Sequence, residues 1–147
     1  MIWKLSLEDR LRRWKDFREQ LNSMDLEQSL VAVSEFWRSC PFTPYYLDPA
    51  RPDQWPDPWT LISENYYCDV AKSLGMLYTI ALTDHKISTE LRIYHNNLGV
   101  YNLAWINDGK YVLNMVDGDI VNNTHLEQTD LVLKFKYSGS ELKLDNY

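Results

Sequence analysis

Cysteine and histidine are scarce in this sequence. Cys40 and Cys68 are the only cysteines, which is too few for a disulfide framework, and their separation is not that of a zinc-binding pair. The three histidines, His85, His95 and His125, are far apart in the chain. We therefore expect no metal centre.

Glycine is also rare, and proline is confined to one segment. The five glycines all lie at Gly75 or later, and the six prolines all lie between Pro41 and Pro58. Every glycine except Gly75 falls in a predicted turn, so no glycine-rich loop suited to a phosphate is present. We expect no bound cofactor, and a chain divided into a helical first part and a glycine-punctuated second part.

Long hydrophobic runs and an excess of positive charge are absent too. No apolar run approaches the roughly 20 residues of a membrane span, and we expect no signal peptide at the start of the chain. The net charge is −6, and the acidic excess lies entirely in residues 41–147. Phosphate binding needs clustered Lys and Arg. We therefore expect neither nucleic acid nor membrane as a partner, and a cytoplasmic protein.

Hydrophobic spacing predicts two helices at the start of the chain. Apolar residues recur at intervals of three and four over residues 7–22 and again over residues 26–40. Capping sequences that begin at Ser6 and Asp25 precede them. The short connection predicts a helical hairpin or one bent helix.

A third helical pattern covers residues 59–83, with one break at Ser63 or Asn65. It is apolar over much of its circumference, which indicates a central buried helix. Gly75 lowers helix stability, so we expect another group to pack closely against it.

From Ile87 onward the hydrophobic period changes to two, which is typical of strands. Asp108-Gly109 and Asp117-Gly118 are strong hairpin signals. The expected strands cover residues 89–95, 100–107, 110–116, 119–123, 130–137 and 141–144. One face of the sheet should be apolar and the other largely wet.

The predicted fold class is α+β, in a single domain of residues 1–147. A helical hairpin (residues 1–40) is followed by a strap rich in proline and aromatic residues (residues 41–58). Residues 59–147 form the buried helix, packed on an antiparallel β-meander of five to six strands.

The strap carries more aromatic side chains than a plain linker needs. Rigid aromatic residues are good anchors at protein interfaces. The candidate interface residues are Trp55, Trp59, Tyr45, Tyr46 and Trp3. The alternative is that the two strap tryptophans fold over the main helix and complete the core.

Cys68 is the candidate nucleophile, because it follows an irregular segment and lies early in a predicted helix. A helix N-terminus favours the thiolate form of cysteine. A Cys on a helix, with a His and an Asp on later strands, is the order in transglutaminase-like cysteine hydrolases. The second half of this chain is similar to that pattern, on Cys68, Trp105 and the run Asp108-Gly109-Lys110-Tyr111.

That resemblance implies a triad of Cys68, His95 and Asp117. The family places its His just before a conserved aromatic residue, where this chain has Tyr101-Asn102-Leu103-Ala104. Either the triad is absent, or it uses His95 in a different geometry. A buried structural cysteine is the alternative for Cys68.

Several short strings resemble small proteins of tailed bacteriophages. They are Phe36-Trp37, Tyr45-Tyr46-Leu47-Asp48, residues 55–62, Tyr67-Cys68 and residues 111–114. The resemblance implies a virion component of the neck, tail or baseplate. The main hypothesis is therefore a non-catalytic structural or assembly protein that binds other proteins, with self-association left open. The alternative is a small cysteine hydrolase, active or degenerate, that uses Cys68.

Overall fold

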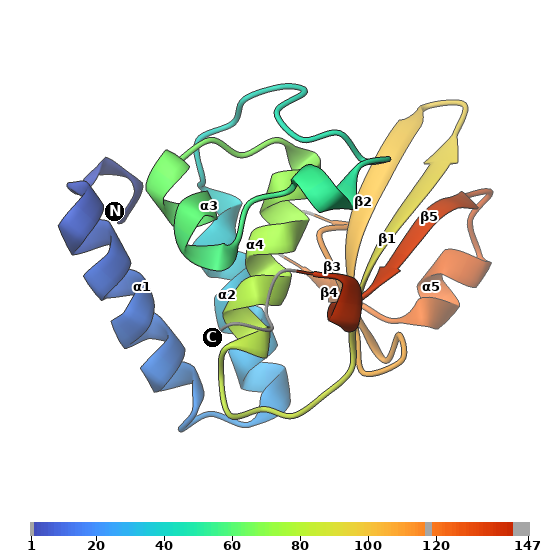
Figure 1. Ribbon diagram of the computed structural model, residues 1–147. Helices are drawn as coiled ribbons and strands as arrows, with labels where there is room; N and C mark the ends of the chain where they lie inside the picture. Colours follow the sequence, from blue (N-terminus) through green and yellow to red (C-terminus); the bar gives the residue numbers. More distant parts are fainter. Residues whose placement is uncertain (1, 117–118, 143–147) are drawn as a thin grey trace.

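Helices occupy the first part of the chain and a sheet the second, as expected for the α+β class (Figure 1). The structure is a computed structural model that describes residues 2–116 and 119–142. The four main helices are α1 (Leu7–Leu21), α2 (Leu26–Arg38), α3 (Pro58–Glu64) and α4 (Asp69–Ala81). No helix in the described ranges is long and apolar enough to cross a membrane.

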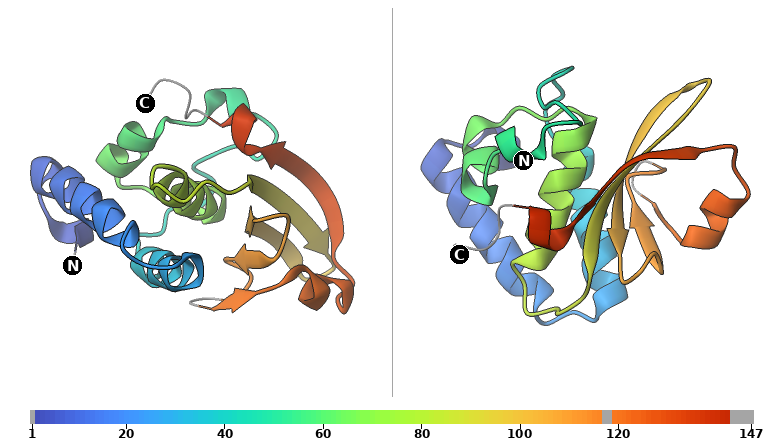
Figure 2. Two further views of the ribbon diagram at one scale, coloured as in Figure 1. Left: turned by 90° about the horizontal axis from the view of Figure 1, so that it is seen from below. Right: turned by 45° about the vertical axis from the view of Figure 1, so that its right-hand side comes forward.

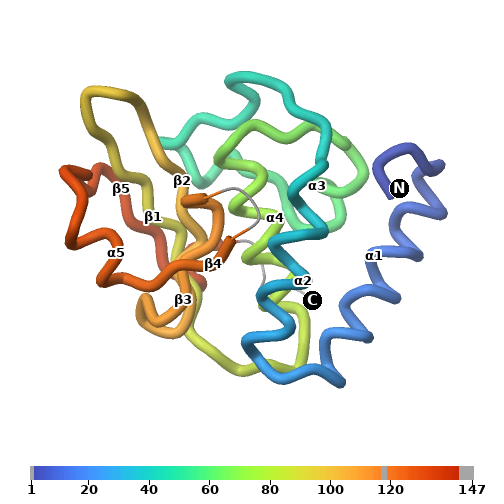
Figure 3. The backbone as a smooth tube through the Cα atoms, turned by 180° about the vertical axis from the view of Figure 1, so that it is seen from behind, coloured from blue at the N-terminus to red at the C-terminus, as the bar shows by residue number. Residues whose placement is uncertain are grey.

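The first two helices begin where the sequence predicts. The Ser6 hydroxyl accepts a hydrogen bond from the backbone N–H of Asp9, and Asp25 forms a reciprocal capping box with Gln28. Helix α1 packs against α3, whereas α2 packs against α4. The two helices therefore diverge from their shared turn, as the backbone trace shows (Figure 3).

The break in the third helical pattern lies at Asn65. This residue ends α3 in a left-handed conformation with φ of 59°, which asparagine tolerates better than most residues. Cys68 then occupies the N-cap of α4. The predicted close contact at Gly75 is confirmed, because a Cβ there would lie only 2.4 Å from Cη2 of Trp37.

In the described part of the chain, five strands form one antiparallel sheet in the order β4-β3-β2-β1-β5. They are β1 (Thr89–Asn96), β2 (Gly99–Ile106), β3 (Tyr111–Leu113), β4 (Ile120–Val121) and β5 (Val132–Ser138). Strands β1 to β4 follow one another as a meander, but β5 returns to pair with β1 at the other edge. Hydrophobic alternation predicts a strand without saying which edge it joins.

Two strand predictions need correction. Glu141, the start of the expected final strand, lies in a short 3-10 helix, η3 (Gly139–Glu141). Residue 123, the end of another expected strand, belongs to α5 (Asn123–Glu127), which the Asn122 side chain caps by accepting from the His125 N–H. The hairpin signal Asp117-Gly118 lies outside the described residues.

Helix α4 is the centre of the molecule. It lies between the group of α1, α2 and α3 and the inner face of the sheet (Figure 2), and most of its residues are buried. The prediction of a central buried helix is confirmed.

The outer face of the sheet is not the wet surface that we expected. Leu103, Trp105, Val112 and Leu126 form a second small core there, and α5 contributes the last of these residues. In β5 the register shifts opposite Ile93 and Tyr94. Such a bulge interrupts the simple alternation on which the prediction rested.

The strap of residues 41–58 is held by the body of this same chain (Figures 1 and 3). The Tyr137 hydroxyl donates a 2.7 Å hydrogen bond to the Pro49 carbonyl, and the Tyr78 hydroxyl donates one of the same length to Pro56. The Trp55 ring packs edge-on against Tyr137, with centroids 5.3 Å apart.

Candidate functional site

The Cys68 thiol lies at the first turn of α4. The residue is 6% exposed and its backbone is extended, as an N-cap requires, but its side chain does not cap the helix. Instead the sulfur accepts a hydrogen bond from the backbone N–H of Leu47, at 3.4 Å. The strap therefore covers the thiol and fixes its position.

A cavity of about 310 Å³ opens beside this thiol. The strap contributes Phe42 and Tyr45 among others, the start of α4 contributes its N-cap Cys68 and Asp69, and β2 contributes residues that include Asn102. The volume is at the lower end of the range for ligand cavities, roughly 300 to 1,000 Å³. Three segments that are distant in sequence thus form one concave site at the end of the central helix.

Asn102 is the polar residue that faces the cavity from the sheet. It is 6% exposed, and its Oδ1 atom is buried without a hydrogen-bond partner. Its backbone is fixed, because its carbonyl oxygen accepts hydrogen bonds from the Ser73 hydroxyl and from Nδ2 of Asn114. The same Asn114 nitrogen lies 2.8 Å from the Ser73 oxygen. The chain therefore fixes the backbone of Asn102, while the side-chain oxygen remains an unused acceptor.

The implied triad of Cys68, His95 and Asp117 is not assembled among the described residues. His95 is exposed on β1, paired with Val100 of β2, and no histidine lines the cavity within the part of the chain that the structure describes. Asp117 lies outside the described residues.

The other two histidines lie elsewhere. The His85 ring is bonded to Ser29 and to the Leu21 carbonyl, at the opposite end of α4. His125 belongs to α5, on the outer side of the sheet.

The sequence pattern pointed to residues 101–104 but did not distinguish Asn102 from its neighbours. The departure from the transglutaminase-like pattern falls on residues 101–104, and the strand period decides which of them faces α4. Ala104 and Ile106 belong to the main core and Leu103 and Trp105 to the second one. The even-numbered positions therefore face the helix, and Asn102 is the polar one in that row.

The candidate interface residues are mostly not free to bind a partner. Trp55 is 2% exposed and Trp3 is buried, so these two predictions are wrong for the folded chain: both indoles complete the core. Trp59 and Tyr46 are half-buried, and the Trp59 ring packs against another tryptophan. Tyr45 alone among the five is fully exposed, at 98%, and it stands at the rim of the cavity.

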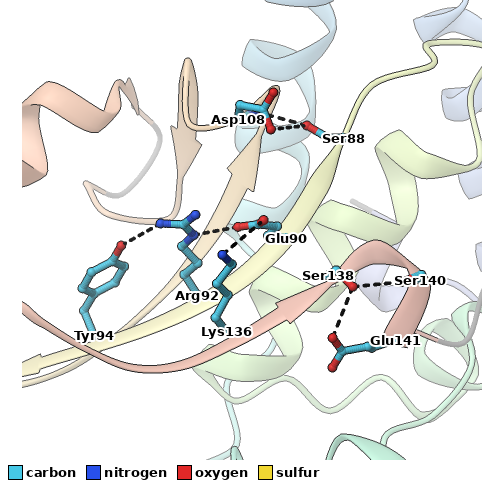
Figure 4. A network of polar contacts seen from close by, with 9 residues as sticks. All are labelled: Ser88, Glu90, Arg92, Tyr94, Asp108, Lys136, Ser138, Ser140 and Glu141. Atoms are coloured by element: carbon cyan, nitrogen blue, oxygen red, sulfur yellow. Dashed lines mark hydrogen bonds and ion pairs between the residues drawn. The ribbon is translucent and has the colours of Figure 1, made fainter.

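A second polar cluster lies on the outer face of the sheet (Figure 4). Arg92 donates to Glu90 at 2.7 Å and to the Tyr94 hydroxyl, and its guanidinium lies 3.9 Å from the Trp105 ring centroid. Lys136 also approaches Glu90. These side chains form hydrogen bonds and ion pairs with one another, and they project from the face of the sheet opposite α4. The cluster is therefore not part of the Cys68 site.

Within the described ranges, no group of three or more His, Cys, Asp or Glu side chains is arranged to hold a metal ion. Among the described residues that line the Cys68 cavity, Asp69 is the one with a charged side chain, so the side chains that line the cavity carry a single negative charge.

Comparison with known proteins finds similarity at the level of structure. No protein-family model matches the chain, and neither does any curated protein. The calcium-bound structure of LapG from Legionella pneumophila superposes with a TM-score of 0.66 and 12% identity, over 90% of this chain and 84% of LapG. The EGTA-treated form gives 0.65 and 13%, over 90% and 82%. The chain therefore shares the fold of LapG.

Proposed function

We propose that this chain is a degenerate relative of the transglutaminase-like cysteine hydrolases, which binds a polypeptide segment in the Cys68 cavity without cleaving it. One observation carries the proposal: the Cys68 thiol shares its cavity with the carboxamide of Asn102, and no imidazole is among the described residues that line it. The similarity in fold to LapG, a transglutaminase-like cysteine protease, supports the relationship to these hydrolases. The position of Cys68 at the start of the central helix supports its assignment to the binding site.

The chemistry of the two side chains favours binding over hydrolysis. A thiol that attacks an amide needs a base within hydrogen-bond reach, roughly 2.6 to 3.2 Å. A neutral carboxamide such as that of Asn102 can accept a hydrogen bond but does not take up a proton near pH 7. Exposed Phe42 and Tyr45 at the rim supply the kind of aromatic surface that protein partners cover.

A role in assembly, including a virion, would use this same cavity. The structural-protein hypothesis from the sequence then becomes more specific: docking would occur at the Cys68 cavity and its rim. Trp55 would support that surface from beneath, because its indole donates to the Asp48 carbonyl within the strap.

A second candidate function is hydrolysis by Cys68 and His95. It is favoured by the strand register, which pairs His95 with the cavity-lining residue Val100. Directly paired residues project from the same face of a sheet, so the imidazole is one position away from the cavity wall. A shift of the β1–β2 end would be needed to bring it to the thiol.

One set of variants separates the two candidates. Hydrolysis of casein and of p-nitrophenyl acetate should be the same for the wild type, Cys68→Ala and His95→Ala. Activity lost in both variants, but kept in a Cys40→Ser control, would establish the hydrolase instead. For binding, peptides selected from a random-peptide display library should lose affinity when Cys68 is alkylated. If no selected peptide is sensitive to Cys68 alkylation, the binding proposal is wrong.

A further inference from the structure

We infer that Asn102 is the recognition residue of the cavity, and that its Oδ1 accepts a hydrogen bond from a backbone N–H of an extended, uncharged or basic peptide. This inference rests on the proposed function and assigns the chemistry of the ligand. The sequence resemblance implied no role for Asn102, and its assignment comes from its burial and its missing partner.

The unused acceptor points to a ligand with a donor. Buried polar atoms in folded proteins nearly always have a hydrogen-bond partner, because an unpaired one loses its hydration without compensation. Asn102 Oδ1 has none, although the residue is held rigidly through its backbone by Ser73 and Asn114. The Cys68 sulfur, by contrast, already accepts from Leu47. Asn102 Oδ1 is therefore the acceptor to which a ligand would donate the missing hydrogen bond.

Charge restricts the ligand further. Asp69 is the one charged side chain that lines the cavity in the described part of the chain, and no Lys or Arg is among the described lining residues. An anionic ligand would meet a carboxylate without a Lys or Arg side chain among the described lining residues to compensate it. A neutral or basic donor meets no such penalty.

The rim indicates a chain molecule in preference to a small compound. Phe42 is 67% exposed, Tyr45 is 98% exposed, and Val100 is also exposed, although all three line the cavity. A compound that only filled the interior would leave these apolar surfaces in water. A peptide that enters the cavity with one residue and continues across the rim would cover them and bring a backbone N–H to Asn102.

A matched pair of probes tests the donor. N-methyl-3-phenylpropanamide is a methylamide whose only N–H is replaced by N–CH₃ in its dimethylamide analogue, and the two are otherwise alike. Each is titrated against the full chain, and binding is followed by the slowing of Cys68 alkylation by iodoacetamide, located by mass spectrometry. The wild type should bind the methylamide about five- to tenfold more tightly, as expected for one hydrogen bond.

Two variants assign that preference to Asn102. In Asn102→Leu, which is nearly the same size but has no acceptor, the ratio of the two affinities should fall to about one. In Asn102→Asp, which places a charged and stronger acceptor of the same shape at this position, the preference for the methylamide should increase, and an unchanged ratio would contradict the assignment. A circular dichroism spectrum of each variant shows whether it is folded, and Asn102→Asp carries the test if Asn102→Leu is not.

The outcomes distinguish this inference from the proposed function. If both probes protect Cys68 equally in the wild type, the cavity binds amides of this kind but Asn102 does not accept a hydrogen bond from their N–H. Only this inference is then wrong. If neither probe protects Cys68 at any soluble concentration, the cavity does not bind such peptides, and both proposals fall.

Discussion

The Leu47 backbone N–H and the Cys68 sulfur lie 3.4 Å apart in a hydrogen bond that joins the strap to the first turn of α4. Leu47 is itself buried, so the contact is protected from water. The accessibility of the thiol therefore depends on how firmly the strap is held. The Tyr137 hydroxyl, which donates to Pro49, holds the strap two residues further along.

Tyr137→Phe should loosen the strap and expose the thiol. The change removes one hydrogen bond and leaves the ring that packs on Trp55. We expect a loss of about 0.5–1.5 kcal/mol in the free energy of unfolding and a several-fold faster alkylation of Cys68 by iodoacetamide. Tyr94→Phe is the matched control, since its hydroxyl bonds Arg92 on the outer face. Equal alkylation rates in both variants would show that the strap does not control access.

Features that depend on contacts between residues close in the sequence were predictable, and features that depend on contacts between distant residues were not. Helix starts are set by neighbours three residues away, as at Ser6 and Asp25, and were readable from the sequence. So was a cysteine at the start of α4. The burial of Trp55 was not, because it depends on Tyr137, which lies far along the chain. Periodicity alone could not choose between core and interface for such a residue.

The sheet and the site show the same limit. Strand β5 pairs with β1 through a register that shifts between Ile93 and Tyr94, and neither this pairing nor the shift leaves a signal in local alternation. Asn102 became distinctive only when β2 was placed against α4. Its polarity was visible in the sequence, but its burial and missing partner were not.

Asn102→His should make the Cys68 thiol more reactive. The change places an imidazole on the cavity wall that Cys68 also lines, and an adjacent imidazole favours the thiolate. We expect alkylation of Cys68 to accelerate by at least about tenfold near pH 7. The increase should persist as the pH falls below about 6, because the protonated imidazole also stabilises the neighbouring thiolate through its positive charge.

The control for this experiment is Asn102→Leu, which alters the same position without adding a base. If the leucine variant is accelerated as much as the histidine variant, the effect comes from a disturbed cavity and not from the imidazole. The rate at Cys40, measured in the same samples, reports any general opening of the fold.

Gly75→Ala should destabilise the protein although it improves helix propensity. The added Cβ would lie 2.4 Å from Trp37 Cη2, and the Trp37 indole is fixed by its hydrogen bond to Thr79 at 3.0 Å. Overpacking of this kind costs about 1–3 kcal/mol, against a gain of at most about 1 kcal/mol from replacing glycine in a helix. Urea unfolding should therefore show a lower midpoint.

A second substitution checks the cause. In a Trp37→Phe background the smaller ring leaves room at Gly75, so adding Gly75→Ala should cost less than it does in the wild type. If the two changes are simply additive, the clash between these residues is not the source of the loss.

Glu64 should make stability depend on pH in a defined direction. Its Oε2 atom is buried without a hydrogen-bond partner, and burial raises the pKa of the carboxyl above its ordinary value of 4.5. The folded state therefore binds this proton more tightly than the unfolded state. The carboxylate form opposes folding, so the stability of the wild type relative to Glu64→Gln should fall as the pH rises from about 4 to 7. Denaturant unfolding of both proteins across that range measures the difference, which cancels the other carboxyl groups. A difference that is constant with pH, or that grows in favour of the wild type, would mean that Glu64 is solvated or paired in the folded protein.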